Sequence, residues 1–429
     1  MTRSYVHLLF LLALGGPVFA QGFAGDSRAV VVHAGQLLDV TTGRLMPEQT
    51  IVVVDDRIAS VGRRGTLDLP ADAEVVDLGD MTVLPGLIDM HVHLTGDAQA
   101  QGYANLAASV PRNALFGAAN ARRTLEAGFT SVRNVGAGGF ADVALRDAIV
   151  NGDVPGPRMR VSGPSLGVTG GHCDNNLLPP EYEAYAGGVA NGPWEIRKKI
   201  RDNIKYGADV IKFCATGGVL SKGTSVGLQQ YSLEEMVALV TEAQLRNRKV
   251  AAHAHGTEGI KAAIRAGVDS VEHASLIDDE GIRLALENDT YLVMDVYVST
   301  YILEMGEAAG FLPESLAKER EVGQAQRSNF RRAHEAGVRM AFGTDAGVYP
   351  HGNNGRQFAY MVDNGMTPIE AIRAATVNAA DLMGWSADVG RIAPGFYADL
   401  VAVRGNPLEN VRELEDVRFV MKGGEIYKQ

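Results

Sequence analysis

Five histidines, one lysine and one aspartate stand at the carboxyl ends of short apolar runs of the chain. They are His91, His93, Lys212, His253, His255, His273 and Asp345. A single histidine in an apolar run is most often a core residue with hydrogen-bonded ring nitrogens. Burying this many titratable groups without metal or pairing would cost several kcal/mol. Because imidazole and carboxylate are ligands for zinc and related divalent ions, the set predicts a metal cluster.

Lys212 needs a separate explanation, because an ammonium group is a poor neighbour for a divalent cation. Desolvation and nearby metal charge both favour the neutral amine. A neutral amine can take up carbon dioxide and become a carbamate, whose two oxygens can bridge two metal ions. Taken alone, Lys212 would be interpreted as a structural ion-pair partner. Beside the other residues it predicts a carboxylated lysine between two divalent metal ions.

Eight short β-rich runs, which alternate with amphipathic segments, must position these residues. The runs are 86–94, 130–136, 158–163, 208–214, 249–255, 270–275, 291–296 and 339–345. Apolar positions three and four apart predict helices between them, as in 193–207, 232–247 and 259–267. Eight strand–helix units predict a (β/α)8 TIM barrel, an α/β fold whose chemistry lies at the carboxyl ends of its strands. A doubly wound open sheet is the main rival, and it is disfavoured because its usual phosphate fingerprint is missing.

Both ends of the chain are rich in short β-type runs, unlike the alternating middle. Residues 29–84 carry apolar runs broken by Gly and Asp, and similar material returns after the turn at 393–395. We therefore expect one small β-sandwich domain, built from residues 21–84 and 391–429. The barrel would then comprise residues 85–390.

The first twenty residues predict a secretory signal peptide (1–20) that is cleaved after Ala20. Its apolar run, residues 6–14, is shorter than the roughly 20 residues that a membrane-spanning helix needs. The mature protein is therefore expected in the periplasm or outside the cell, without a membrane anchor. The chain holds only two cysteines, Cys173 and Cys214. This excludes a disulfide scaffold and leaves open whether the two are free thiols.

The formal net charge is −11, whereas nucleic-acid binding draws its affinity from clustered Lys and Arg. Nucleic acid is therefore excluded as a partner. We expect a small-molecule substrate and a homo-oligomeric enzyme.

Five strand-end motifs, in order along the chain, are similar to those of the amidohydrolase superfamily. They are PGLIDMHVHL (85–94), DVIKFCATGG (209–218), VAAHAHG (250–256), SVEHA (270–274) and AFGTDAG (341–347). The chain most resembles the imidazolonepropionase-like branch, with its bacterial Xaa-Pro and Xaa-Arg/Lys dipeptidases and ochratoxin-degrading amidohydrolases. The resemblance covers nearly all of the mature sequence. It implies a binuclear metal-dependent hydrolase that cleaves amide bonds.

The resemblance also assigns the two metal ions, for which zinc is the expected element. One ion would be held by His91, His93 and Asp345, and the other by His253 and His273, with carboxylated Lys212 as the bridge. Asp345 would also be the general base. The chemistry agrees, because a water between two metals loses much of its pKa and Asp345 can carry its proton to the leaving amine.

Further residues are candidates for substrate binding, since loops at this face of a barrel often carry function. They are His172, Tyr231, His255, His351 and Arg133. Ordinary loop hydrogen bonding is the alternative for the first four, and Arg133 could instead pair with a structural acid. Two divalent ions supply a charge of +4, and the carbamate, Asp345 and a bridging hydroxide supply −3, so the metal site would keep a charge of +1. This charge favours a dipeptide or N-acyl amino acid with a free C-terminal carboxylate, ochratoxin A included. The loops show no acidic cluster, so we expect an apolar or aromatic C-terminal side chain.

Two rival functions are weaker. The sequence Gly163-Pro164-Ser165-Leu166-Gly167 matches the G-x-S-x-G pattern of serine hydrolases, but no helical periodicity follows it, as the nucleophile elbow requires. A periplasmic protein that binds metal or solute without catalysis would fit the export signal. It would not need Asp345 beside a metal-bound water.

Overall fold

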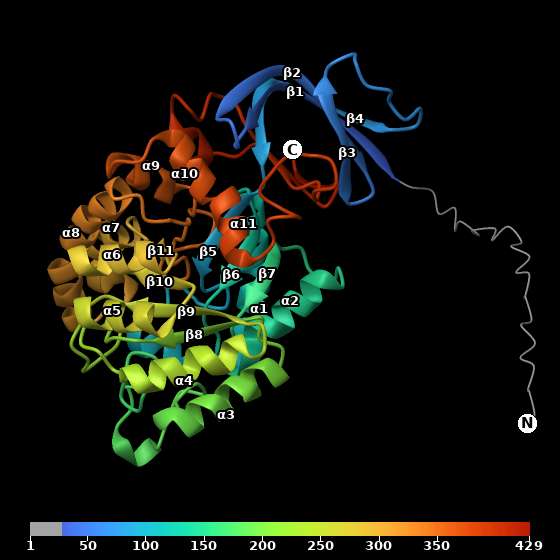
Figure 1. The fold of residues 1–429 in the computed structure, drawn as a ribbon. Helices are drawn as coiled ribbons and strands as arrows, with labels where there is room; N and C mark the ends of the chain where they lie inside the picture. The colour runs from blue at the N-terminus through green and yellow to red at the C-terminus, as the bar shows by residue number, and fades with distance from the viewer. Residues whose placement is uncertain (1–27) are drawn as a thin grey trace, which may run out of the picture.

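The computed structural model describes residues 28–429, so the expected signal peptide lies outside the described residues. A barrel surrounded by helices forms the larger body, and a strongly curved sheet lies beside one end of it (Figure 1). No helix among residues 28–429 is long and apolar enough to cross a membrane.

Seven strands from both ends of the chain form one sheet. They are β1 (Ala29–Asp39), β2 (Arg44–Val54), β3 (Arg57–Arg63), β4 (Glu74–Pro85), β12 (Leu400–Val403), β13 (Phe419–Lys422) and β14 (Glu425–Lys428), in the order β14-β13-β12-β4-β1-β2-β3. The long strand β4 joins the two ends, because it pairs with β1 on one side over residues 74–83 and with β12 on the other side through its last four residues. Side chains from all these strands except β14 supply the buried centre of one apolar core. Both chain ends thus build one small β-domain, as predicted, and its strands form one continuous sheet folded around this core.

Seven of the eight expected barrel runs form parallel strands. These strands are β5 (Leu87–Val92), β6 (Phe129–Asn134), β7 (Arg158–Val161), β8 (Val210–Cys214), β9 (Lys249–Ala254), β10 (Ser270–His273) and β11 (Tyr291–Val293). They pair as β5-β6-β7 and β8-β9-β10-β11. Isolated parallel bridges connect these sheets at Leu166–Phe213 and close the ring at Leu292–Met340 and Val92–Ala346.

The eighth run, 339–345, closes the barrel without forming a regular strand. Its backbone turns into the left-handed region at Asp345, where φ is 55°, and this turn interrupts the extended pairing that a ladder requires. The amide of Met90 nevertheless donates to the carbonyl of Phe342, and that of Asp345 to the carbonyl of His91. The predicted eight-membered ring is therefore present, with its last member held by single bridges and side-chain contacts.

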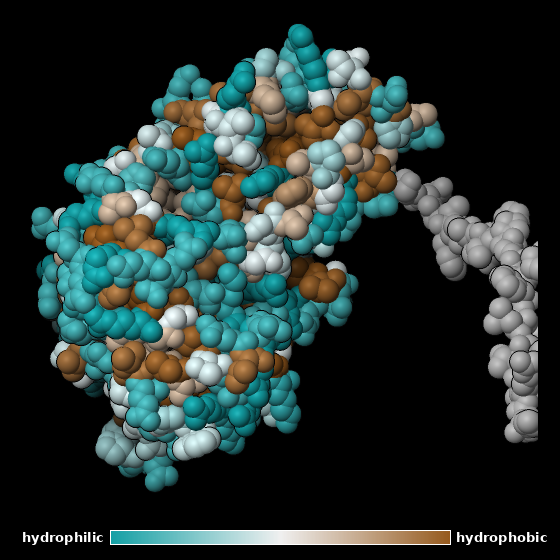
Figure 2. Space-filling model, in the orientation of Figure 1, coloured by the Kyte–Doolittle hydropathy of each residue, from teal (hydrophilic) through white to brown (hydrophobic). Residues whose placement is uncertain are grey.

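Eleven α-helices among residues 28–429 accompany the strands. They are α1 (Val110–Glu126), α2 (Ala141–Val150), α3 (Gly192–Lys205), α4 (Leu233–Gln244), α5 (Thr257–Ala266), α6 (Asp279–Glu287), α7 (Val298–Met305), α8 (Pro313–Glu335), α9 (Arg356–Asp363), α10 (Pro368–Ala374) and α11 (Val377–Met383). Their apolar faces pack on the barrel; Ile260 and Ile264 of α5, for example, are fully buried. Hydrophilic side chains predominate on the outer face of these helices (Figure 2). This is the division expected of amphipathic helices around a buried parallel sheet.

Cys173 and Cys214 form a disulfide bond between the segment after β7 and the last residue of β8. The sequence left open whether the two cysteines are free thiols, and the structure shows that they are paired.

An ion pair joins the barrel to the curved sheet. Arg158 at the start of β7 donates from Nε and one terminal nitrogen to the two carboxylate oxygens of Asp399, at 3.1 and 3.2 Å. Asp399 is buried and also accepts the amide N–H of Gly423. The guanidinium groups of Arg158 and Arg57 both lie against the ring of Tyr397. The joint therefore depends on charges that are largely removed from water.

Replacing Asp399 by Ala should lower the free energy of unfolding by about 3 kcal/mol, because it leaves the half-buried Arg158 cation without its partner. Urea-induced unfolding measures the loss. The exposed pair Arg28–Glu74 provides the control, since Glu74→Ala should cost less than about 1 kcal/mol. Equal losses in the two variants would show that the joint does not depend on this ion pair.

Candidate active site

A cavity of about 480 Å³ opens at the carboxyl ends of the barrel strands. All six residues predicted to bind metal contribute to its lining. They are His91, His93, Lys212, His253, His273 and Asp345. The barrel thus brings together polar side chains from strand ends that are far apart in sequence, such as β5 and the closing segment 339–345. The volume suits a small-molecule ligand.

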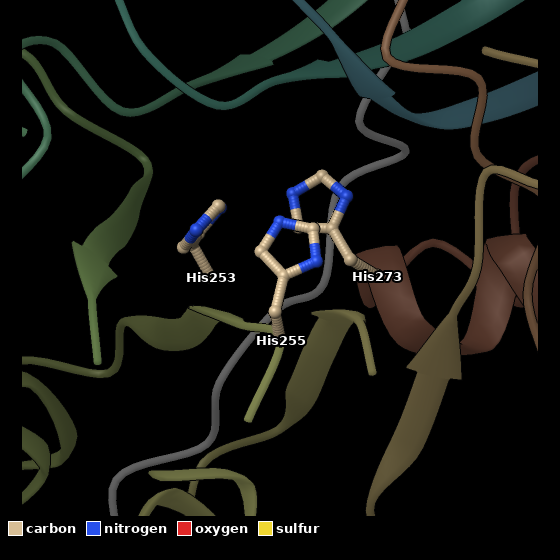
Figure 3. Close-up of side chains that lie close together, drawn as sticks. All are labelled: His253, His255 and His273. Atoms are coloured by element: carbon tan, nitrogen blue, oxygen red, sulfur yellow. The ribbon is translucent and has the colours of Figure 1, made fainter. Parts of the chain in front are cut away.

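Two overlapping groups of side chains have the geometry of metal ligands. One consists of His253, His255 and His273, and the other of His91, His273 and Asp345; within each group the potential ligand atoms lie within 4.8 Å of one another. The rings of His255 and His273 are stacked and that of His253 is nearly perpendicular to both, with ring centres 4.6 to 4.8 Å apart (Figure 3). His255, predicted as a substrate residue, is thus also placed among the possible ligands.

Asp345 lies between the two histidines at the carboxyl end of β5. Its Oδ1 is 3.2 Å from Nε2 of His93 and 3.5 Å from Nε2 of His91. These three side chains point at one small volume, as expected of ligands to a common ion.

Two buried nitrogen atoms in this cavity lack hydrogen-bond partners. They are Nζ of Lys212 and Nε2 of His253. An unsatisfied buried polar atom is costly, and both atoms are of the kind that binds metal or, for the lysine, carbon dioxide. Burial lowers the pKa of Lys212 to about 8, which favours the neutral amine that carboxylation requires. The residues present therefore fit a metal site with a modified lysine.

Buried carboxylates fix the orientation of two of the imidazoles. Nδ1 of His91 lies 2.9 Å from Glu272, and Nδ1 of His273 lies 2.9 Å from Asp295, which Gln326 also contacts. Each contact leaves the Nε2 atom directed into the cavity, the arrangement typical of metal-binding histidines. Burial lowers the pKa of His91 to about 4, so its ring is neutral and able to act as a ligand.

Glu272 and Asp295 were not predicted from the sequence. Glu272 directly precedes His273 within the motif SVEHA, and Asp295 lies at the end of the seventh run. Both positions carried an available signal, because an acidic residue at a barrel strand end is costly to bury without a function.

The backbone at two of the site residues is strained. His273 has φ of 66° and Asp345 has φ of 55°. A left-handed backbone at a residue other than glycine costs of order 1–3 kcal/mol, and such residues cluster at functional sites. At both positions the strand ends in a sharp turn that aims the side chain across the barrel mouth.

The five candidate substrate residues separate into two groups. His172 and His255 line the cavity, whereas Arg133, Tyr231 and His351 do not. The hydroxyl of Tyr231 donates to the carbonyl of Ala190. The ring of His351 contacts Thr124 and the carbonyl of His93. These two side chains therefore support the loops around the site.

Arg133 lies beneath the predicted metal ligands with its side chain almost fully buried. It donates to the carbonyl of Met90, to Ser270 and, at 2.8 Å, to Glu272. Because Glu272 holds His91, the guanidinium supports the site from below. The geometry favours the structural alternative for Arg133 over contact with a substrate.

Ser165 does not have the surroundings of a serine nucleophile. Its hydroxyl donates to the carbonyl of Val135, and the next α-helix begins only at Gly192. The strand–turn–helix geometry of a nucleophile elbow is therefore not formed here.

The wall of the cavity on the side of α7 and α8 is mainly apolar but carries two polar side chains. Val298, Ile302 and Val322 line it together with Glu319 and Gln326. Burial raises the pKa of Glu319, although Ser299 hydrogen-bonds its side chain. Among residues 28–429 no basic side chain forms an ion pair with it. Inspection of the loops alone missed this residue, because it comes from the interior of a helix.

Known proteins resemble this chain over nearly its whole length. The model of the Amidohydrolase family matches residues 82–427. The ochratoxinase of Aspergillus niger is 34% identical, over 94% of this chain and 87% of that protein.

Two solved structures have the same fold. A Xaa-Pro dipeptidase with methionine bound in its active site gives a TM-score of 0.88 at 39% identity, and covers 94% of this chain and 100% of that one. A prolidase in complex with N-methylphosphonate-L-proline gives 0.84 at 33% identity, over 94% and 100% of the two chains.

Replacement of Arg133 by Met should lower the free energy of unfolding by about 3 kcal/mol, because it keeps the apolar stem but leaves Glu272 as an unpaired buried charge. Thermal and urea unfolding measure this loss. Arg122→Met is the control, since Arg122 forms an exposed pair with Glu126 and its loss should cost no more than about 0.5 kcal/mol. Unchanged stability together with a raised KM would instead place Arg133 at the substrate.

Proposed function

This chain belongs to the Amidohydrolase family, and on that premise we propose a binuclear metal-dependent hydrolase of dipeptides or N-acyl amino acids. The established part is a hydrolytic enzyme that acts on amide C–N bonds. The proposal adds two divalent ions, with zinc as the expected element, a carboxylated Lys212 and a substrate that ends in a free carboxylate.

One observation supports the metal proposal above all others. Nζ of Lys212 and Nε2 of His253 are buried without partners beside the two groups of potential ligands. A carbamate on Lys212 and a pair of cations would satisfy both atoms and balance the carboxylate of Asp345. When bound, the two ions would acidify the attacking water and polarise the amide carbonyl.

The proposal assigns the proton transfer to Asp345, whose carboxylate lies beside His91 and His93. Its carboxylate accepts a proton from the water as the water oxygen adds to the amide carbon. It then returns that proton to the leaving nitrogen as the C–N bond breaks, so that an acid and an amine are released. Burial lowers the pKa of His172 to about 3, so its neutral ring can donate a hydrogen bond to the carbonyl oxygen or to the substrate carboxylate.

The proposed substrates follow from the lining and from the relatives. Methionine in one relative and a proline derivative in another are consistent with a free amino acid as one product. The apolar wall of Val298, Ile302 and Val322 favours an apolar or aromatic C-terminal side chain. Ochratoxin A, on which the Aspergillus niger relative acts by its name, combines an amide with such a residue and belongs in the proposed range.

Export to the periplasm or beyond is part of the proposal. The Cys173–Cys214 disulfide supports it, because disulfides persist in oxidising compartments and are rare in the cytosol.

We predict that the purified enzyme holds close to two divalent ions per chain and that Lys212→Ala holds fewer than one, because the variant lacks the bridging ligand. Activity should fall by about 100-fold or more, with partial recovery in acetate. Elemental analysis gives the metal content independently of activity. The control is Lys261→Ala, which removes a buried lysine that pairs with Glu258 and Glu280 and should keep both ions. Full activity and two ions in Lys212→Ala would rule out the bridge.

The substrate prediction is tested with N-acyl amino acids and their C-terminal amides. Free acids should show kcat/KM at least about tenfold higher than the amides, since a carboxylate adds charge-assisted hydrogen bonds. Acyl-Phe should be cleaved faster than acyl-Lys or acyl-Arg. Equal rates on acids and amides would remove the carboxylate from the proposal, and a preference for the basic residues would reverse the expected side chain.

A further inference from the structure

The segment 162–191, between β7 and α3, brings His172 into the cavity. It is long, and its one helical element is the single turn Pro180–Tyr182. Connections of this length are uncommon inside compact domains and usually serve a binding or catalytic site. Such a segment also has much conformational freedom to lose, so something must hold it in place.

The disulfide anchors this segment at the residue next to His172. Cys173 is bonded to Cys214, with their Cα atoms 5.9 Å apart, an ordinary separation for a disulfide. Cys214 ends β8 only two residues after Lys212. The covalent bond thus ties the segment to the same strand that carries the proposed bridging lysine.

The space around His172 is shaped to accept its ring in one position. A Cβ atom at Gly218 would lie 2.4 Å from Cε1 of that ring, and a Cβ atom at Gly167 would lie 2.7 Å from Cβ of Cys173. The ring stacks on His253 with centres 4.1 Å apart, and Nδ1 lies 2.9 Å from Oγ of Ser221. These non-covalent contacts specify where the ring sits but can separate together if the segment moves.

We propose that the Cys173–Cys214 disulfide is a positioning element of the reaction, which holds His172 against His253 at the substrate cavity. The proposal rests on the proposed function, because a fixed imidazole matters only if it contacts the amide substrate. The bond holds Cys173, the residue next to His172, and so limits how far the segment that carries this ring can move. A displacement of about 1 Å in such a group can cost on the order of 100-fold in rate.

A double-mutant cycle tests the coupling. Cys173→Ser, Cys214→Ser and the double variant should each lower kcat/KM about tenfold while the content of divalent ions stays unchanged. The three should behave alike, because each removes the same bond, and this agreement controls for local effects of either cysteine. In a His172→Ala background, removal of the disulfide should cost less than twofold, since no imidazole remains to be positioned.

Two results would overturn the proposal. One is full kcat/KM in the cysteine variants; the other is the same loss in the presence and absence of His172, which would reduce the bond to a purely structural role. Amide hydrogen exchange of residues 166–176 provides a readout that needs no substrate, and it should accelerate at least tenfold in the double variant. If the wild-type enzyme cleaves no amide, the proposed function fails. The exchange rate then decides by itself whether the bond fixes His172, and an unchanged rate rejects it.

Discussion

The shortage of hydrogen-bond partners for buried polar groups at the barrel mouth is the constraint on which the rest of the structure depends. Four buried histidine rings, Lys212 and the largely buried Asp345 lie together here, and Nζ of Lys212 and Nε2 of His253 have no hydrogen-bond partner. Isolated charges cannot be buried there at acceptable cost. Burial accordingly lowers the pKa of His91 and of Lys212, which favours their uncharged forms, and carboxylates below the site hold the rings of His91 and His273. Arg133, Glu272 and His91 form one such support, in which each member makes the burial of the next tolerable.

The same constraint accounts for the irregular closure of the barrel. In a regular eighth strand, side chains would alternate between the two faces of the sheet, and this alternation would fix the direction of the Asp345 side chain. The left-handed turn at that residue instead places its carboxylate between His91 and His93. The cost of the strained backbone is offset by the neighbouring bridges to β5 and β11. Regular strand pairing is thus interrupted at the residue that is proposed to carry the proton.

Sequence patterns were sufficient for the order of elements and for the residues that meet at the barrel mouth. The spacing of apolar residues and the alternation of strands with helices predict a barrel. Because the strand ends of a barrel converge, the proximity of His91 and His253 could be predicted from the sequence. The patterns failed where a position depends on tertiary packing. Tyr231 and His351 lie in loops near the site yet turn their polar atoms to the backbone, and nothing local distinguishes them from His172. The pairing of Cys173 with Cys214 likewise depends on where the segment after β7 folds back.

Glu319 bears on the proposed preference for an apolar substrate side chain, because it is an acidic residue in a mainly apolar wall. Burial raises the pKa of its carboxyl group, since low polarity disfavours the charged form. An apolar substrate side chain would exclude water further and disfavour the charged form more strongly. A basic side chain would lose its own hydration beside the carboxyl group, and their attraction repays the desolvation of both groups only when the geometry is close to ideal. Val298, Ile302 and Val322, which line the same wall, have no side-chain atoms that could add hydrogen bonds to such a pair. The desolvation cost therefore supports the proposed preference for an apolar side chain, even though the wall contains an acid.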